Sequence, residues 1–414
     1  MNSATLEGIT AQELLAPAKE VVELLPEPDY PVNYQPTWPN KQAVIDAVHE
    51  LRNTGEATTP DRVDALSAHL FDIATGRSDK LLGVTGKCAD RLLFNKKIHS
   101  LLELGRITLS KAAGVLLERE VVLEAGDYSF ISRVLNFAKP RTNAKDKDKE
   151  GTEFDSWFGD SVNGKSFRER TPDASRMVSA ALESRDVMAA MTDIAGEHVP
   201  VAHELLLLPY EIGMLRQDSE SGRLYSLSAD MLWIGARTND PEGAHVNLAA
   251  MIANPVGVKL GPDTTTEQVA ALAAKLNPDG IPGKLTFMIR MGVDNIDVMD
   301  STLEAIQLYA PESIVLYDPH GSTIKQEGVK IRAVDCITSE IQVLARVCNA
   351  NKMALHGVLL ETTPDNNREE CVEALGQMPR DMPDVDPLLN SRQLGRILRR
   401  VAPVLGRKAM GLVA

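Results

Sequence analysis

The fold is predicted from the stretch VGVKLG at Val256 to Gly261, together with LTFMIRMG at Leu285 to Gly292. Each stretch is a short apolar run, and the segment between them is longer and amphipathic. A run that suits a buried strand, followed by a helical pattern and by another such run, is typical of a βα unit in a parallel sheet. The same alternation of short apolar runs and longer amphipathic segments begins at Leu81 and continues on both sides of this stretch.

Counted from Leu81, the chain contains short apolar runs that each predict a strand. They are Leu81 to Gly86, Ser132 to Phe137, Ala202 to Leu208, Met231 to Ala236, Val256 to Gly261, Leu285 to Gly292, Ser313 to Asp318 and Leu355 to Glu361. Because eight parallel strands suit a closed barrel, we predict an α/β fold of the (β/α)8 TIM-barrel type. The third run is ambiguous, since Leu205 to Leu215 could equally form a helix and short apolar runs cannot be typed by periodicity.

The chain divides into an extension and a catalytic barrel. Residues 1–80 form a predicted N-terminal extension that packs on the barrel or on a partner subunit, with helical patterns at 11–25 and 41–52. Residues 81–414 form the barrel, with an insertion at about 142–198 after the second strand. The insertion begins with the polar cluster AKDKDKEGTEFD, which predicts a long loop over one barrel end.

Composition excludes several classes of protein. Apolar residues make up 43% of the 414 residues and aromatic residues 4%, as in a globular protein. A net charge of −14 opposes binding to a nucleic-acid backbone. The chain has neither a basic, apolar leader nor an apolar run near ~18 residues, so we expect no membrane partner and a cytoplasmic location. The four cysteines form no CxxC pair, which fits a reducing compartment.

Four cations lie at or near the ends of different predicted strands: Arg141, Arg237, Lys259 and Arg290. In a β/α barrel the carboxyl ends of the strands converge on one mouth, where the active site forms. Crowded positive charge needs anionic partners, and arginine matches phosphate and carboxylate oxygens with a planar fork. The set therefore favours a phosphorylated carboxylic acid as the ligand. Taken singly, each cation could instead pair with a nearby Asp or Glu.

Candidate metal ligands follow three of the same strands and the loop after the last one. Cys88 follows the first run, His320 the seventh and Glu361 ends the eighth, and Asp386 lies in the loop beyond. A thiolate, an imidazole and carboxylates suit a divalent metal such as Mn, Co, Fe or Zn. The alternative for a lone cysteine is a small buried apolar residue, and for a lone histidine a structural or surface group. Their shared barrel end favours the metal.

An ordered set of motifs resembles the type II DAHP synthases, enzymes that make 3-deoxy-D-arabino-heptulosonate 7-phosphate. The resemblance covers nearly the whole chain, and the length is most similar to the short members of phenazine and other secondary pathways. The motifs in chain order are NYQPTWPN, NFAKPRT, GDSVNG, HELLLLPYEIGMLR, WIGARTNDPEGAHV, NPVGVKLGP, LNPDGIPGKLTFMIRMG, DPHGST, LLETTPDNNREEC and DPLLN.

The resemblance implies an aldol-like condensation. In it, C3 of phosphoenolpyruvate attacks the aldehyde of erythrose 4-phosphate, water adds at C2 and inorganic phosphate leaves. A divalent metal, Mn²⁺ or Co²⁺, polarises the aldehyde carbonyl. Matched motif by motif, the metal ligands are Cys88, His320, Glu361 and Asp386. The positions that hold phosphoenolpyruvate are Arg141, Arg237, Lys259 and Arg290, and the catalytic residues are Lys259, Arg290 and His320.

The sequence departs from the family pattern at several of these motifs. Lys87 replaces an acid beside Cys88 and Asp90 replaces a Glu, Ala236 replaces a Glu before Arg237, and Leu359 stands in the place of a His. The motif DPHGST is one residue shorter before its histidine. These changes raise the hypothesis that phosphoenolpyruvate and metal binding persist while the acceptor is an aldehyde other than erythrose 4-phosphate.

Three hypotheses follow. The leading one is an active DAHP synthase, and the second is a synthase of the same type with another aldehyde. The third is an inactive relative that serves as a regulatory subunit, against which the retained Cys, His, Glu and Asp argue. Family members are usually dimers or tetramers, so we expect a homodimer or homotetramer.

Overall fold

The computed structural model describes residues 34–54, 56–87, 92, 100–134, 145–319, 323–383 and 385–405. The helical pattern predicted at 11–25, together with Cys88, Arg141 and His320, lies outside the described residues. Within the described part, no helix is both long enough and apolar enough to cross a membrane.

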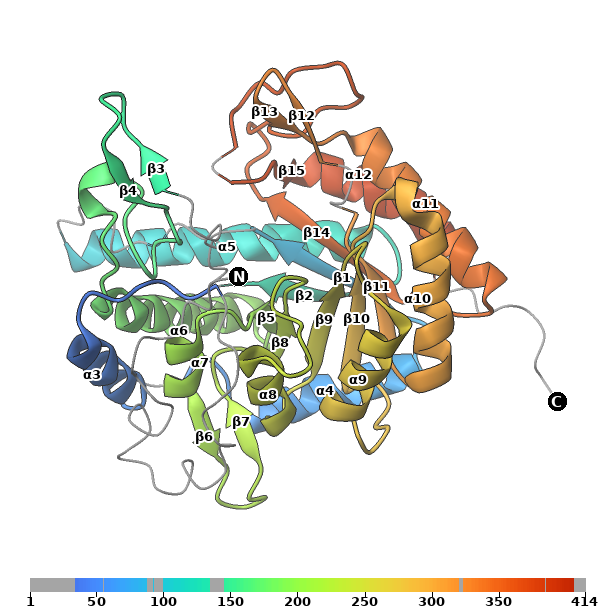
Figure 1. Cartoon of the computed structure of the whole chain (residues 1–414), viewed down its shortest axis with the longest axis horizontal. Helices are drawn as coiled ribbons and strands as arrows, with labels where there is room; N and C mark the ends of the chain where they lie inside the picture. The colour runs from blue at the N-terminus through green and yellow to red at the C-terminus, as the bar shows by residue number, and fades with distance from the viewer. Residues whose placement is uncertain are drawn as a thin grey trace.

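Eight parallel strands form a closed barrel, as the apolar runs predict (Figure 1). The first and last strands pair with each other, with Leu82 opposite Gly357 and Gly86 opposite Glu361. In order around the barrel the strands are β1 (Leu81–Gly86), β2 (Tyr128–Arg133), β5 (Val201–Glu204), β8 (Met231–Ile234), β9 (Val256–Leu260), β10 (Leu285–Ile289), β11 (Ile314–Tyr317) and β14 (Gly357–Thr363).

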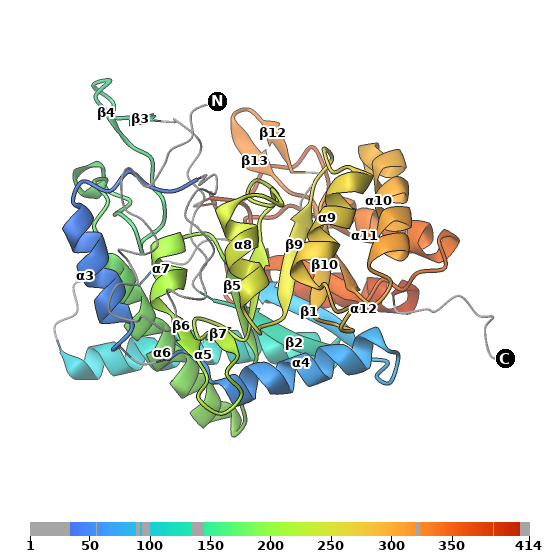
Figure 2. The same ribbon diagram turned by 60° about the horizontal axis from the view of Figure 1, so that its bottom comes forward.

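Helices follow these strands in turn and cover the outside of the barrel (Figures 1 and 2). They are α5 (Leu101–Glu124), α6 (Ser175–Ala195), α7 (Leu208–Gly213), α8 (Ala244–Met251), α9 (Thr266–Leu276), α10 (Ile296–Tyr309), α11 (Val334–Ala350) and α12 (Ser391–Val401). Short 3-10 turns lie at Phe167–Glu169, Val293–Asn295 and Ala402–Val404.

Among the residues that the structure describes, three antiparallel hairpins and one short strand are added to the barrel. The hairpins pair β3 (Lys145–Lys147) with β4 (Glu153–Asp155), β6 (Leu215–Gln217) with β7 (Leu224–Ser226), and β12 (Ile324–Gln326) with β13 (Val329–Ile331). The short strand β15 (Leu389–Asn390) pairs in parallel with the carboxyl end of β14. The hairpin β3–β4 lies in the segment predicted as a polar loop, and both it and β12–β13 rise on the side of the carboxyl strand ends (Figure 2).

Two of the predicted strands differ from their apolar runs. The second strand covers Tyr128–Arg133 instead of 132–137. The sequence pattern misplaces it because the polar side chains of Ser129 and Ser132 interrupt the apolar pattern of YSFISR. The third strand ends at Glu204, and the leucine-rich remainder begins helix α7 at Leu208. Both readings of that run are therefore partly right.

In the described part of the extension, two helices precede the barrel, α3 (Lys41–Leu51) and α4 (Pro60–Ala74). Helix α4 starts where the Thr59 side chain accepts a hydrogen bond from the backbone N–H of Arg62, with Pro60 in the first turn. Its buried Leu66, Leu70 and Ile73 recur at helical spacing. Figure 2 shows α4 across the end of the barrel opposite the carboxyl strand ends.

The buried face of α4 completes the core inside the barrel. Its leucines share one apolar cluster with side chains from seven of the strands, among them Val84, Trp233, Met288 and Leu359, all fully or almost fully buried. Because side chains alternate across a strand, the next inward position toward the carboxyl end lies two residues further on. The apolar cluster therefore lies directly below the side chains at the carboxyl ends of the strands, which line the mouth of the barrel.

Replacing Leu70 tests this closure. Leu70→Ala removes a fully buried side chain from the interior cluster and should lower the free energy of unfolding by about 3 kcal/mol. The control Leu308→Ala, on α10, removes a side chain that is 69% exposed and should change it by less than about 0.5 kcal/mol. Urea denaturation followed by circular dichroism measures both. Equal effects at the two positions would contradict the role given to α4.

Candidate active site at the barrel mouth

The inward positions of the strands change from apolar to charged at one level of the barrel. Gly257 precedes Lys259, Met288 precedes Arg290, and Leu359 precedes Glu361 by two residues each. The same step leads to Arg133, Glu204 and Asp318 on three further strands. Since period-2 alternation keeps these side chains on one face of the sheet, they form a charged layer directly above the apolar interior.

Lys259 and Arg290 share one buried carboxylate. The Lys259 Nζ atom lies 2.6 Å from Asp318 Oδ2, and Arg290 Nη1 lies 3.5 Å from the same oxygen. Asp318 is fully buried and Lys259 is 5% exposed, so the pair is shielded from water. Asp318 thus holds two of the predicted anion-binding cations side by side.

Glu361 lies between two buried arginines. Arg332 Nη1 lies 2.8 Å from Glu361 Oε2, and Arg133 Nη1 lies 3.5 Å from Glu361 Oε1. Arg332 also donates to the backbone carbonyl of Pro387 at 2.5 Å, next to Asp386. Asp386 accepts from Lys330 Nζ at 2.5 Å. The two carboxylates predicted to bind metal are therefore joined through Arg332 and the loop that carries Asp386.

The carboxylates of the layer act together on Arg290. Burial acts to lower the pKa of Arg290, but nearby negative charge outweighs it and raises the pKa above its usual value. The contributing carboxylates are those of Asp318, Glu361, Asp386 and Glu204. The partly exposed guanidinium of Arg290 is therefore close enough to interact electrostatically both with Asp318 and with the predicted metal carboxylates, Glu361 and Asp386. Beside it a cavity of about 380 Å³ opens, lined also by Thr323, Lys325 and Lys330 of the β12–β13 hairpin.

Trp233 forms the floor under the charged layer. Its ring is fully buried, with the Arg133 guanidinium 5.2 Å and the Lys259 ammonium 5.6 Å from the ring centroid. An aromatic face attracts cations electrostatically, more strongly where water is excluded. The ring thus contributes to fixing both cations at the level of the mouth.

Arg237 occupies a different place from Lys259 and Arg290. It is exposed on the loop after β8, with its guanidinium 5.3 Å from the centroid of the Tyr34 ring. Its loop is tied to β9, because the Asn239 side chain donates to the backbone carbonyl of Lys259 at 2.9 Å. Of the three predicted cations that the structure describes, two are thus brought together on Asp318 and the third lies on the rim.

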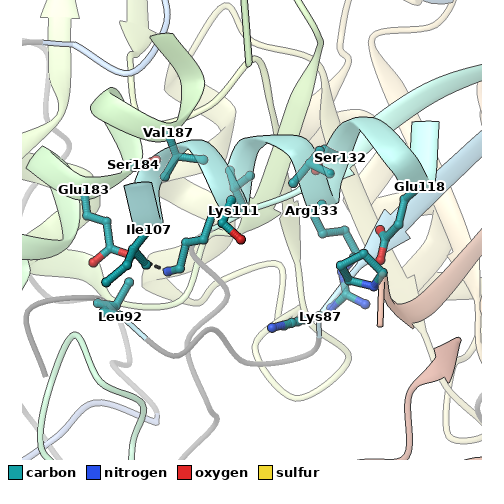
Figure 3. A pocket seen from close by; sticks show the side chains of 16 residues that line it. Lys87, Leu92, Ile107, Lys111, Glu118, Ser132, Arg133, Glu183, Ser184 and Val187 are labelled. Atoms are coloured by element: carbon teal, nitrogen blue, oxygen red, sulfur yellow. Dashed lines mark hydrogen bonds and ion pairs between the residues drawn. The ribbon is translucent and has the colours of Figure 1, made fainter. Parts of the chain in front are cut away.

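A second cavity, of about 330 Å³, adjoins the mouth between helices α5 and α6. Figure 3 shows Arg133 and Lys87 at one end of it and the Lys111–Glu183 ion pair at the other. Arg133, which contacts Glu361, therefore also faces this cavity. Lys87, which stands in the place of an acid in the predicted metal motif, is partly buried there.

The structure describes only two of the four predicted metal ligands. Glu361 and Asp386 are described, whereas Cys88 and His320 are not. In the part of the chain that the structure describes, no group of three or more His, Cys, Asp and Glu side chains could hold a metal ion. The four-ligand set therefore stays a prediction.

Several residues of the layer were not among the predicted site residues. Asp318 ends the seventh apolar run, and a buried acid at a strand end could have been found from that position. The apolar runs place Arg133 second in a predicted strand, whereas strand β2 ends at this residue. Arg332 and Lys330 come from the β12–β13 hairpin segment. Because this hairpin is not part of the barrel, a search for polar residues at barrel strand ends does not find them.

Fold and mouth together define the class: a β/α-barrel enzyme with its site at the carboxyl strand ends. The model of the class-II DAHP synthetase family matches residues 27–198 and 192–396. The chain belongs to this family and is therefore an enzyme, a synthase of the transferase type.

Individual relatives agree with the family. A probable phospho-2-dehydro-3-deoxyheptonate aldolase of Pseudomonas fluorescens is 31% identical over 375 residues, covering 87% of this chain and 92% of the relative. A phospho-2-dehydro-3-deoxyheptonate aldolase of Mycolicibacterium smegmatis is 29% identical, covering 91% and 93%. The solved structure of the enzyme of that name from Francisella tularensis is similar in fold, with a TM-score of 0.51 and 15% identity, covering 97% of this chain and 98% of that one.

A double-mutant cycle tests the buried pair at the mouth. Asp318→Asn leaves Lys259 without its counter-charge and should lower the free energy of unfolding by about 3 kcal/mol. Lys259→Met should be similarly costly. Together they should cost clearly less than their sum, because neither buried charge is then left alone. Urea denaturation measures all three variants.

The matched control is Asp72→Asn, whose exposed partner Arg77 lies 3.9 Å away, and it should cost less than about 1 kcal/mol. Additive effects of the two mouth substitutions would show that Asp318 and Lys259 do not act as a pair.

Proposed function

We propose that the mouth binds phosphoenolpyruvate and condenses it with erythrose 4-phosphate to give DAHP and inorganic phosphate. The observation that carries the proposal is the pair of cations held by the buried Asp318 at the end of an otherwise apolar barrel. Family membership supports the same reaction, and the relatives described above carry the name of the enzyme that performs it.

The cations would seat the anionic substrate before any bond changes. Lys259 and Arg290 are the inner members, and Arg237 on the rim and Arg141 complete the set that the motifs imply. A cation fixed in a dry site stabilises negative charge more effectively than a mobile one in water. In the reaction C3 of phosphoenolpyruvate forms the new bond to the aldehyde carbon, water adds at C2, and the C–O bond to phosphate breaks. Lys259 and Arg290 would stabilise the phosphate as it leaves.

A divalent metal fits the carboxylate side of the mouth. Glu361 and Asp386 both raise the pKa of Arg290, so their charges converge on one region. With Cys88 and His320 they would provide two oxygens, a thiolate and an imidazole, a set suited to Mn²⁺ or Co²⁺. A bound metal of this kind supplies Lewis-acid polarisation of a carbonyl oxygen. Arg332 would orient Glu361 for that role, since it holds one carboxylate oxygen at 2.8 Å.

The departures at Leu359, Ala236 and Lys87 do not favour another acceptor. Leu359 is fully buried in the apolar cluster below the mouth, where it packs among carbon atoms. Ala236 lies exposed beside Arg237, and Lys87 faces the cavity between α5 and α6. We therefore propose erythrose 4-phosphate as the acceptor.

The cytoplasmic location and the homo-oligomer predicted above belong to the same proposal. The described cysteines, Cys336, Cys348 and Cys371, are free. Burial raises the pKa of the Cys348 and Cys371 thiols to about 12, so both are unreactive near neutral pH.

The reaction is tested by phosphate release from phosphoenolpyruvate with a panel of metals and aldehydes. Release should be fastest with erythrose 4-phosphate, stop with a chelator and return with Mn²⁺ or Co²⁺. Lys259→Met should lower kcat/KM by about 10²–10³-fold. The same exchange at the exposed Lys41, Lys41→Met, should leave it unchanged. Faster release with another aldehyde would overturn the proposed acceptor.

Metal content is a separate measurement. The purified protein should bind one Mn²⁺ per chain in equilibrium titration, and Cys88→Ala or Glu361→Gln should weaken binding at least about 10-fold. The control Glu220→Gln changes an exposed acid in the β6–β7 hairpin and should have no effect. Unchanged binding in the first two variants would show that the metal set is wrong.

A further inference from the structure

Helix α5 has apolar side chains on the face that points away from the barrel. Its inner face is fixed by the buried Ala112, Glu118 and Val122, and Glu118 accepts hydrogen bonds from Thr85 on β1 and Thr362 on β14. The outer face nevertheless carries three exposed leucines: Leu102 at 67%, Leu109 at 52% and Leu117 at 60%. A helix that is apolar on both faces is normally covered on both. Figures 1 and 2 show α5 at the periphery, beside α6.

The outer face carries two leucines and two opposite charges at equal distances on either side of Ala113, which is itself exposed. Leu109 and Leu117 lie four residues to either side, Arg106 and Glu120 seven, and Leu102 and Glu124 eleven. At 3.6 residues per turn these separations keep all seven residues on one side of the helix. In an antiparallel pair of identical helices, a twofold axis at Ala113 places each residue opposite the one equally far on the other side. Leu109 then meets Leu117 and Arg106 meets Glu120, whereas Leu102 lies opposite Glu124.

The charges fit the same arrangement. Arg106 is exposed and makes no ion pair with the described part of the chain. The one ion pair of Glu120 within the same described residues is with the neighbouring Arg119, at 3.5 Å. Around an axis at Ala113, Arg106 of each copy meets Glu120 of the other, and Leu109 of each packs on Leu117 of the other. A parallel pairing would oppose Arg106 to Arg106. Because each chain carries a net charge of −14, association needs local complementarity of this kind.

We propose that the outer face of α5, meaning Leu102, Arg106, Leu109, Ala113, Leu117, Glu120 and Glu124, is an isologous interface that binds the same face of a second copy of this chain. The two α5 helices run antiparallel with Ala113 on the twofold axis. This goes beyond an expected homo-oligomer, since it assigns the surface and the orientation.

Light scattering of the full chain after size exclusion tests the surface. Leu109→Glu and, separately, Ala113→Glu should halve the molar mass of the wild-type assembly, because each places buried carboxylates at the interface. The control Leu308→Glu, at a leucine that is 69% exposed on α10, should leave the mass unchanged. Circular dichroism checks that every variant is folded. A monomeric wild type would overturn the proposal, and residues 1–33 or another protein would then be the candidates that cover α5. An assembly that survives both substitutions would overturn it as well.

A charge reversal tests the orientation. Arg106→Glu and Glu120→Arg should each weaken the association constant at least about 10-fold, since each places like charges opposite one another. The double variant carries both changes in both copies and should restore the wild-type mass. A helix that was merely damaged by either substitution would not recover in this way. Failure of the double variant to reassemble would rule out the antiparallel register.

Discussion

The pairing of β1 with β14 is the constraint on which the site depends. It closes the barrel and places Gly86 opposite Glu361. The close approach tolerates no side chain at Gly357, because an added Cβ would lie 2.0 Å from the carbonyl oxygen of Leu82. Once the register at this seam is set, the pleat decides for each strand which residues face inward. A shift by one residue would turn the mouth charges to the outside and bury their apolar neighbours in their place.

The closed register separates two layers with opposite chemistry. Below lies an apolar interior completed by α4, and above it lie acids and bases that neutralise one another in pairs. Trp233 lies between the two, since its ring packs among the interior side chains and carries Arg133 and Lys259 on its faces. Buried charge without a partner is costly, so the carboxylates of Asp318 and Glu361 are a condition of folding for the cations that they pair with.

The fold could be predicted from the sequence because strand runs and helical patterns alternate with regular lengths. The eight strands are confirmed, and the errors arise where composition misleads. YSFISR carries two serines and reads as less apolar than the VLNF that follows, and a continuous run of leucines gives no period to separate β5 from α7. In both cases the tertiary environment, and not the local pattern, determines where the strand lies.

The site could be predicted only where it follows strand ends. Lys259, Arg290 and Glu361 are in the charged layer for that reason. Arg332 could not be found in this way, because it reaches Glu361 from the segment after a hairpin and not from the end of a barrel strand. Arg237 follows a strand end but turns outward onto Tyr34, which depends on a contact with the distant N-terminal segment.

Helix α4 closes the far end of the barrel, and this has a consequence for how the sequence can change over evolution. The packing that α4 completes lies on one side of Trp233 and the charged layer on the other, so substitutions at the mouth leave most of the interior packing untouched. Positions such as Lys87 and Ala236 can therefore diverge among relatives without loss of the fold. Trp233 itself has no such freedom, because any replacement alters the interior packing and the charged layer at once.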